Sequence, residues 1–270
     1  HIKENDYSIR PGAAVRTLMG DIEPLVEMQA KHEMEIQASA FLGTSPIRQF
    51  TEGWTMEKLV TTMEGAVSYA VENDVQVMFV TEDTTRSNPE DVKMIYQRAM
   101  ELGVRRLCVC DTCGHVTPNG VKKLLSFIDE EVIKDAGYQR REIEVNWHGH
   151  QDRGLGVANN IAAVEAGADV IHGTALGVGE RAGNAPLDQT LVNLKLMGVI
   201  ENDLTLWTLT CKKPTNTSKF LCLVTILSLE RMPLKQVLES MHLPLSRQCE
   251  RVTIGLLTEF ILAFPPVILV

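Results

Sequence analysis

The sequence predicts an α/β protein, a (β/α)8 TIM barrel in incomplete form, with about six of the eight strand and helix units present. Short apolar runs rich in β-branched residues recur along roughly the first 180 residues. Helix-like segments lie between these runs at a period of about 30 to 40 residues, and polar residues follow each run directly. This alternation is typical of right-handed βαβ units, which build a parallel sheet.

The expected strands and helices alternate in order along the chain. We expect strands within residues 7–15, 33–41, 75–84, 105–113, 141–150 and 169–179. Helical patterns cover residues 21–32, 55–73, 88–103, 117–137 and 185–198, and a further pattern follows residue 154. Pro89 and Pro118 stand near the helix starts, and Gly103, Gly137 and Gly167 follow the last turns, as helix termini commonly require.

Polar side chains gather just after the carboxyl ends of the expected strands. These positions are Thr44–Ser45, Glu82–Asp83, Asp111–Thr112, His148–His150 and Gly179–Arg181. In a (β/α)8 barrel this face carries the active site, and in an open sheet the same edge forms the ligand crevice. No Gly-x-Gly-x-x-Gly motif opens any of the helices, so we favour the barrel over a dinucleotide-binding fold.

Composition excludes some functions and indicates a compartment. The net charge is -9 at pH 7 and no run of Lys and Arg is present, which argues against nucleic acid as a partner. Three of the six cysteines lie at positions 108, 110 and 113, too close for a disulfide framework, which indicates a reducing compartment. We expect a cytoplasmic location, or an organelle if a transit peptide precedes His1, because the chain does not begin with Met.

The composition changes near residue 206. We expect residues 1–205 to form the partial barrel domain, and residues 206–270 to be an aberrant tail that is not a native domain. The tail has no Asp, one Gly and one Ala but 14 Leu, and its charge is positive, whereas the preceding residues are acidic. Glu259 and Pro265–Pro266 interrupt its closing apolar stretch, so we expect no membrane span.

His148 and His150 end the strand expected at residues 141–150. Alternate residues of a strand project to the same side, so both imidazoles can point into one site, and Gly149 leaves room between them. The His-x-His pattern alone is a weak signal, because many such pairs are surface or hydrogen-bonded histidines. Its place among other polar strand ends favours a divalent metal, Zn, Mn or Mg, acting as a Lewis acid on a carbonyl.

Two further strand ends offer catalytic candidates. Glu82 and Asp83 could cap the next helix or pair with Arg86, and we assign Asp83 to structure. Glu82, beside a cationic metal, is a candidate for a catalytic or electrostatic role. Thr112 has a hydroxyl able to bind a substrate carboxylate. Thr44 and Arg86 are further substrate-binding candidates from the same face.

The remaining polar residues near the strand ends allow both structural and functional roles. Cys110 and Cys113 form a Cys-x-x-Cys that could be redox-active or bind zinc, but no second pair is nearby, which favours packing. In the segment GERAGN the glycines permit a tight backbone near a ligand, and Asn184 could give an oxygen to the metal or orient the substrate. His115 and His172 are expected in packing or supporting roles.

Five segments together resemble the Claisen-condensing acyltransferases of the isopropylmalate, homocitrate and citramalate synthase family, relatives of HMG-CoA lyase. They are FLGTSPIRQ, FVTEDTTRS, CDTCGHVTP, WHGHQDRGLGVANNIAAVEAGAD and HGTALGVGERAGN, in family order, and the resemblance spans nearly all of residues 7–205. It implies a metal-dependent TIM barrel in which His148 and His150 bind the metal and Asn184 lies at or near it. It also implies that Thr112 helps to hold a 2-oxo acid and that Glu82 lines the reaction centre.

The resemblance further implies a reaction and its partners. In such enzymes a divalent metal chelates the 2-oxo acid and polarises its ketone, the enolate of acetyl-CoA attacks, and thioester hydrolysis drives release. The expected partners are therefore a small 2-oxo acid and acetyl-CoA, and an intact family member is expected to be a homodimer. Two alternatives stay open: a carbon-carbon lyase or aldolase on the same barrel, and a non-catalytic fragment or pseudoenzyme.

Two departures from the family pattern predict impaired activity. The family opens with a strand bearing an Arg-Asp-Gly-Glu-Gln-like motif, whose Asp is a metal ligand, and neither that strand nor the second is recognisable here. Removing two of eight strands leaves open sheet edges and predicts poor stability. The second departure is in the tail. If suitable synonymous codons encode it from about residue 213, translation in the frame that starts at the third base of each codon gives a sequence that resembles the family's segment after the barrel. We therefore interpret residues 206–270 as a frame-shifted translation, which also removes a histidine that the resemblance links to deprotonation of acetyl-CoA.

Overall fold

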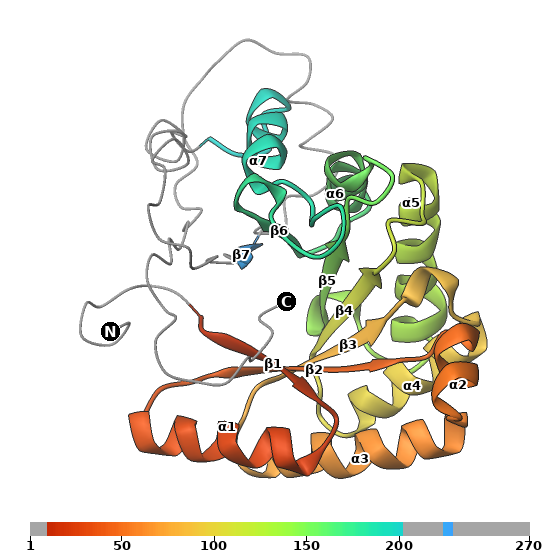
Figure 1. Cartoon of the computed structure of the whole chain (residues 1–270), viewed down its shortest axis with the longest axis vertical. Coiled ribbons are helices and arrows are strands. Elements are labelled where there is room, and N and C mark those ends of the chain that lie inside the picture. The colour runs from red at the N-terminus through yellow and green to blue at the C-terminus, as the bar shows by residue number, and fades with distance from the viewer. Residues whose placement is uncertain (1–9, 202–223, 229–270) are drawn as a thin grey trace.

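The computed structural model describes residues 10–201 and 224–228 as a curled sheet with helices along its outer side (Figure 1). The strand order is β1-β2-β3-β4-β5-β6-β7, so sequence neighbours are also neighbours in the sheet. The strands are β1 (Gly12–Arg16), β2 (Gln37–Gly43), β3 (Val77–Glu82), β4 (Arg106–Asp111), β5 (Glu144–Gly149), β6 (Val170–Thr174) and β7 (Val224–Ser228). Strands β1 to β6 pair in parallel, and β7 pairs antiparallel with β6. The prediction of an incomplete TIM barrel is confirmed, because six parallel strands form a half-barrel.

Helices connect the parallel strands and cover the outer face. They are α1 (Met19–His32), α2 (Pro46–Glu52), α3 (Met56–Glu72), α4 (Pro89–Glu101), α5 (Pro118–Phe127), α6 (Gly156–Glu165) and α7 (Leu187–Leu196). Helix α5 continues directly into a π-helix, η3 (Ile128–Lys134), and shorter 3-10 turns are η2 (Thr84–Arg86), η4 (Arg140–Glu142) and η5 (Ala175–Gly177). The predicted helix at 117–137 is therefore two consecutive helical forms.

The helix ends follow the signals in the sequence. Asn88 and Thr117 cap α4 and α5, because their side-chain oxygens accept backbone N–H groups at 3.1 and 3.3 Å. Each cap contributes about 1 kcal/mol. Gly103, Gly137 and Gly167, which follow the ends of these helical segments, have φ values of 100°, 84° and 86°, the left-handed conformation that glycine adopts without strain. The predicted termini are confirmed at these positions.

Helix α2 is an element that the apolar pattern does not predict. None of its residues is buried, so it has no hydrophobic stripe to detect. Ser45 caps it by accepting the Arg48 backbone N–H at 3.4 Å, and Pro46 occupies the first turn. The Ser-Pro pair was therefore the available signal.

The two faces of the sheet differ in chemistry. The outer face packs against the helices through fully buried side chains such as Phe79, Leu107 and Trp147, each contributing about 2–3 kcal/mol. Residues of opposite parity face inward, and in β5 these are Asn146 and His148, which are both buried. Strand β5 therefore places polar groups on the concave side of the half-barrel, beside the apolar Met78, Cys108 and Cys110 of the neighbouring strands.

Part of the predicted tail lies within the described residues. Strand β7 (Val224–Ser228) pairs with β6 (Val170–Thr174), and the rest of 206–270 lies outside them. In the part of the chain that the structure describes, no helix is both long and apolar enough to cross a membrane.

Candidate active site

His148 and His150 lie at the carboxyl end of β5, and their ring nitrogens face each other. The Nε2 atoms are 3.1 Å apart, and the rings meet nearly edge to face with centroids 5.0 Å apart. Both residues are buried. His150 is tied to the neighbouring strand end, because its backbone N–H donates to the Asp111 carbonyl at 3.3 Å. The strand geometry thus directs two imidazoles toward one point, as the sequence predicts.

The charge state of the pair suits metal ligation. Burial lowers the pKa of His148 well below its usual value, with smaller effects from His172 and His150. Burial also lowers the pKa of His150, and the Arg181 charge adds to the shift. Both imidazoles are therefore neutral near pH 7, which is the form that binds metals.

The distances and unpaired atoms also fit a divalent cation. Two nitrogens each about 2.0–2.1 Å from one metal lie about 3.0–3.4 Å apart in common geometries, and the observed separation falls in that range. The Oδ1 atom of Asn184 is buried without a hydrogen-bond partner among the described residues. The Nδ1 atoms of His148 and His150 are also unpartnered there, but they point away from the facing Nε2 atoms. No group of three or more His, Cys, Asp or Glu side chains there could hold a metal. The candidate donors are thus the two facing Nε2 atoms, together with the amide oxygen of Asn184, the residue that pairs with His150 in a β-bridge.

Asn184 reaches this edge from the loop after β6. It forms a β-bridge with His150, flanked by hydrogen bonds from Gln151 N to Gly183 O at 2.8 Å and from Ala185 N to Gly149 O at 3.1 Å. Its amide nitrogen donates to the Val178 carbonyl at 3.4 Å, which leaves the buried Oδ1 as the free acceptor. Oxygen is the amide atom that binds a hard cation.

Thr112 lies just beyond β4 with its hydroxyl partly buried. Its Oγ1 accepts the Asp83 backbone N–H at 2.8 Å, a bond that does not use the hydroxyl hydrogen. The neighbouring Asp111 is fully buried and holds the loop by accepting the His115 N–H at 2.8 Å and the Thr85 hydroxyl at 3.0 Å. Thr112 is therefore a fixed hydroxyl that can still donate to an anion.

Glu82 ends β3, beside Gly43 of β2 in register. Burial raises the pKa of Glu82, while the Arg48 guanidinium, 3.6 Å away, opposes the shift. Arg48 extends from α2 across Gly43, where a Cβ would lie only 2.8 Å from the Arg48 side chain. The sequence analysis did not identify Arg48. The available signal was Gly43, a residue without a side chain just before the Ser45–Pro46 start of α2.

Arg86 and Thr44 are held by neighbouring side chains. Arg86 forms a two-bond ion pair with Asp83 at 2.7 and 2.8 Å, and its Nη2 lies 3.1 Å from the Cys113 sulfur. The structural assignment of Asp83 agrees with this pair. Thr44 is fully buried and donates to the Ser87 hydroxyl at 2.9 Å. Their contacts couple both residues to the η2 region, whereas His148, His150 and Asn184 form a separate group.

The cysteines pack as expected. Cys108 and Cys110 are buried on the inner face of β4 with their sulfurs 3.9 Å apart, and Cys113 is partly exposed in the following loop. The His172 Nδ1 is 4.0 Å from the Cys108 sulfur, and its ring packs edge to face on His148 with centroids 5.5 Å apart. His172 thus packs against His148, one of the candidate metal ligands.

The arrangement of these strand ends has a counterpart in a known family. A sequence model of the HMGL-like family matches residues 2–219. The chain belongs to the HMGL-like family.

Named relatives of this HMGL-like chain include synthases. It is 36% identical over 190 residues to a probable 2-isopropylmalate synthase of Methanopyrus kandleri, covering 70% of this chain and 35% of that protein. It is 32% identical over 180 residues to the homocitrate synthase AksA of the same organism, covering 67% of this chain and 42% of that protein. The chain spans about a third of the length of the first of these relatives.

Solved structures of the same shape support the fold. The HMG-CoA lyase of Bacillus subtilis superposes with a TM-score of 0.58 at 18% identity, covering 77% of this chain and 72% of that one. At this identity the likeness concerns the fold.

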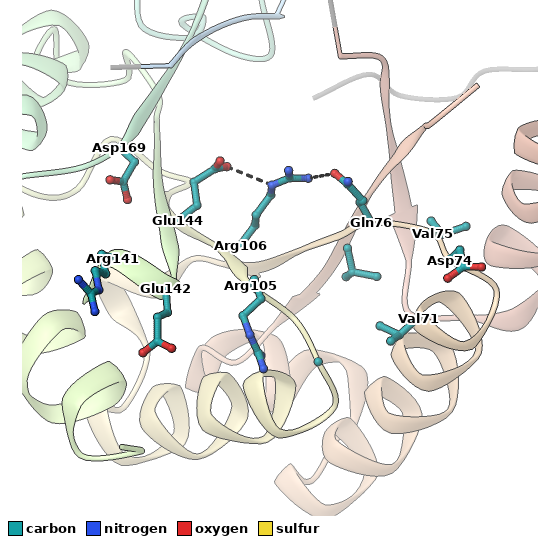
Figure 2. A pocket seen from close by; sticks show the side chains of 12 residues that line it. Val71, Asp74, Val75, Gln76, Arg105, Arg106, Arg141, Glu142, Glu144 and Asp169 are labelled. Atoms are coloured by element: carbon teal, nitrogen blue, oxygen red, sulfur yellow. Dashed lines mark hydrogen bonds and ion pairs between the residues drawn. The ribbon is translucent and has the colours of Figure 1, made fainter. Parts of the chain in front are cut away.

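A cavity of about 590 Å³ lies at the opposite, amino end of β3 to β5 (Figure 2). Arg106 crosses it, donating to Gln76 and lying 3.5 Å from the Glu144 carboxylate. Its guanidinium also donates to Gln37 at 3.1 Å. In this HMGL-like chain the cavity is therefore separate from the histidine pair, and the Arg106 that crosses it is paired with neighbouring side chains.

Proposed function

We propose that this chain is the metal-binding part of an acyltransferase that condenses acetyl-CoA with a 2-oxo acid, as in 2-isopropylmalate synthase. The observation that carries the proposal is the buried pair of His148 and His150, with facing Nε2 atoms 3.1 Å apart, bridged through the His150 backbone to Asn184, whose Oδ1 has no partner among the described residues. The names of relatives that are 32–38% identical support the synthase chemistry.

The proposed site assigns a role to each group. His148, His150 and Asn184 would hold a divalent metal, Zn, Mn or Mg, through two nitrogens and one oxygen. When bound, such a metal polarises the ketone of a 2-oxo acid and makes its carbonyl carbon electrophilic. Thr112 donates its hydroxyl hydrogen to the substrate carboxylate and fixes its orientation. Orientation by such contacts is a large part of catalysis.

Glu82 can move a proton at the same edge. Because burial raises its pKa, the carboxyl group is closer to the working pH than an exposed glutamate, which suits an acid or base. Arg48 holds the ionised form in place at 3.6 Å. Arg86 and Thr44 contact this region indirectly. Arg86 pairs with Asp83, whose backbone N–H donates to Thr112, and Thr44 donates to the Ser87 hydroxyl. We propose indirect contributions to substrate binding for both.

A carbon-carbon lyase on the same half-barrel is the second candidate. The HMG-CoA lyase structures share its fold, and both reactions need a metal-bound oxygen-bearing substrate. The synthases rank first because their sequence identity to this chain is about twice that of the lyases.

We also propose that this chain turns over slowly or not at all, and that residues 206–270 are out of frame. The proposal rests on the abrupt change in composition near residue 206, because a frame shift there removes the histidine that the resemblance links to deprotonation of acetyl-CoA. Sequencing the coding DNA around codons 200–215 tests the second point, because an intact frame through the tail contradicts it.

The function is tested by substrate binding to the metal-loaded chain. We expect calorimetry to show that short 2-oxo acids bind only with Mn²⁺ present, and that Thr112→Val weakens binding about tenfold, the effect of one hydrogen bond to a charged group. Thr112→Ser restores it. Thr51→Val is the matched control, because Thr51 is an exposed helical threonine whose hydroxyl bonds only its own helix, to Ile47 O at 2.8 Å.

Activity assays separate the candidates. Thiol release from acetyl-CoA with any 2-oxo acid, even at a trace rate, supports the synthase. Cleavage of a 3-hydroxyacyl-CoA without thiol release favours the lyase. Metal binding without binding of any 2-oxo acid, or no metal binding at all, favours a non-catalytic fragment, and failure to bind metal contradicts both enzyme candidates.

A further inference from the structure

Arg181 occupies the loop between β6 and α7 in an unusual conformation. Its φ is 53°, in the left-handed region that non-glycine residues rarely adopt. Such a conformation costs about 1–3 kcal/mol and persists only where surrounding contacts fix it. The side chain makes those contacts, so the question is what they hold together.

The guanidinium of Arg181 joins two neighbouring loops to its own. Its Nε donates to Asp152 Oδ1 at 2.8 Å and its Nη2 to Asp152 Oδ2 at 3.1 Å, a two-bond pair. The same Nη2 donates to the backbone carbonyl of Thr112, and Nη1 lies 3.1 Å from the Glu180 carboxylate. One side chain thus spans the loops after β4, β5 and β6.

The three loops carry Thr112, His150 and Asn184. Asp152 lies two residues after His150, and Asn184 lies three residues after Arg181 in the loop that pairs with His150. Gly114 already touches this junction, because a Cβ there would lie 2.9 Å from Asp152 N and 3.2 Å from His150 O. Small movements of one loop are therefore transmitted to the others through backbone contact.

We propose that Arg181 is a positioning residue that sets the spacing of these three loops, and with it the relation of Thr112 to the His150 and Asn184 donors. The proposal rests on the proposed function for the roles of those three residues. Arg181 makes no hydrogen bond to a candidate ligand side chain in the described contacts, so it holds the loops through Asp152 and the Thr112 carbonyl, while its charge also acts on His150. A lysine can replace it only in part, because a single ammonium lacks the planar fork that holds a carboxylate and a carbonyl together.

The test compares Arg181→Met, Arg181→Lys and Asp152→Asn with Arg98→Met. Arg98 is the matched control, because its side chain is 39% exposed against 42% for Arg181 and it also pairs with two carboxylates, Glu64 and Glu101, on the helical surface. Each variant is assayed for Mn²⁺ affinity by calorimetry, for 2-oxo acid affinity and for amide hydrogen exchange.

We expect Arg181→Met to weaken Mn²⁺ binding about tenfold or more, as removal of a supporting partner does. Asp152→Asn should act in the same direction, and the double variant should be little worse than Arg181→Met, because both changes remove one pair. Arg181→Lys should fall between. Hydrogen exchange should accelerate at Gly114 and Gln151, while Arg98→Met leaves every readout near wild type.

The outcomes separate this inference from the proposed function. If the wild type binds Mn²⁺ and Arg181→Met binds it with the same affinity, the positioning role is overturned while the proposed function stands. Full recovery of Mn²⁺ affinity in Arg181→Lys has the same consequence. If the wild type binds no metal, the proposed function fails. Hydrogen exchange then still tests whether Arg181 holds the loops, because unchanged exchange at Gly114 and Gln151 in Arg181→Met overturns the inference. An Arg181→Met variant that does not fold is replaced by Asp152→Asn, which keeps the side-chain shape.

Discussion

The two ends of the same sheet use polar groups in opposite ways. At the amino end, Arg106 pairs with Gln76 and Glu144 across the cavity (Figure 2) and also donates to Gln37, so this buried charge is satisfied by protein groups. At the carboxyl end, the Nε2 atoms of His148 and His150 face each other, and the buried Oδ1 of Asn184 has no hydrogen-bond partner among the described residues. Buried polar groups cost free energy unless something binds them. The contrast separates groups that stabilise the fold from groups available to a ligand.

The largest expected effect comes from removing a candidate ligand. His150→Ala should lower Mn²⁺ affinity at least about 100-fold, because one of two nitrogen donors is lost, while changing metal-free stability little. Calorimetry and thermal unfolding measure the two effects. His115→Ala is the control from the exposed loop after β4. Equal Mn²⁺ affinities in His150→Ala and His115→Ala would contradict the assignment of the carboxyl end to ligand binding.

The next effect concerns the amino end. Arg106→Met should lower the free energy of unfolding by about 2–3 kcal/mol, because Glu144 and two glutamine side chains lose a shared partner, and it should leave Mn²⁺ affinity unchanged. Urea unfolding checks the first and calorimetry the second. A loss of metal affinity matching that of His150→Ala would show that the two ends are not independent.

A smaller effect is expected for Thr44. Replacing it by valine removes a buried hydroxyl that donates to Ser87, which should cost about 1 kcal/mol of stability. Substrate and metal affinity should stay within twofold of wild type, as measured by calorimetry. A large loss of 2-oxo acid affinity at unchanged stability would instead make Thr44 a direct substrate contact.

The smallest effect is a pH dependence at Glu82. Its pKa is raised in the folded state, so its contribution is more favourable below the unfolded value of about 4.3 and is lost as pH rises through the folded value. Glu82→Gln should therefore gain stability relative to wild type as pH rises from about 4 to 7. Urea unfolding at several pH values measures this difference. A difference that shrinks with rising pH would mean that the Arg48 pair outweighs burial.

The sequence predicts the parts of this molecule that repeat or obey local rules. The six strands and the capped helices follow from apolar period and from Pro and Gly positions, and the adjacency of His148 and His150 follows from strand alternation. Long-range pairing is different. That Arg181 bonds to Asp152, or that Arg48 crosses Gly43 to Glu82, depends on how loops from separate units meet, and no local period records it. Helix α2 was missed because it buries nothing.

The π-helix η3 makes the chain tolerant of a change in length. A wider turn brings residues five apart onto one face, so Ile128, Val132 and Ile133 are all fully buried. Deleting one residue there would let the turn tighten to an ordinary α-helix while Gly137 keeps its place at the end. Helix α4 has no π-turn that could tighten. A one-residue deletion before Ile95 would therefore turn Ile95 and Tyr96 out of the core. Among the described helices that cover the sheet, the α5–η3 segment is thus a place where we expect the loss of one codon to be tolerated.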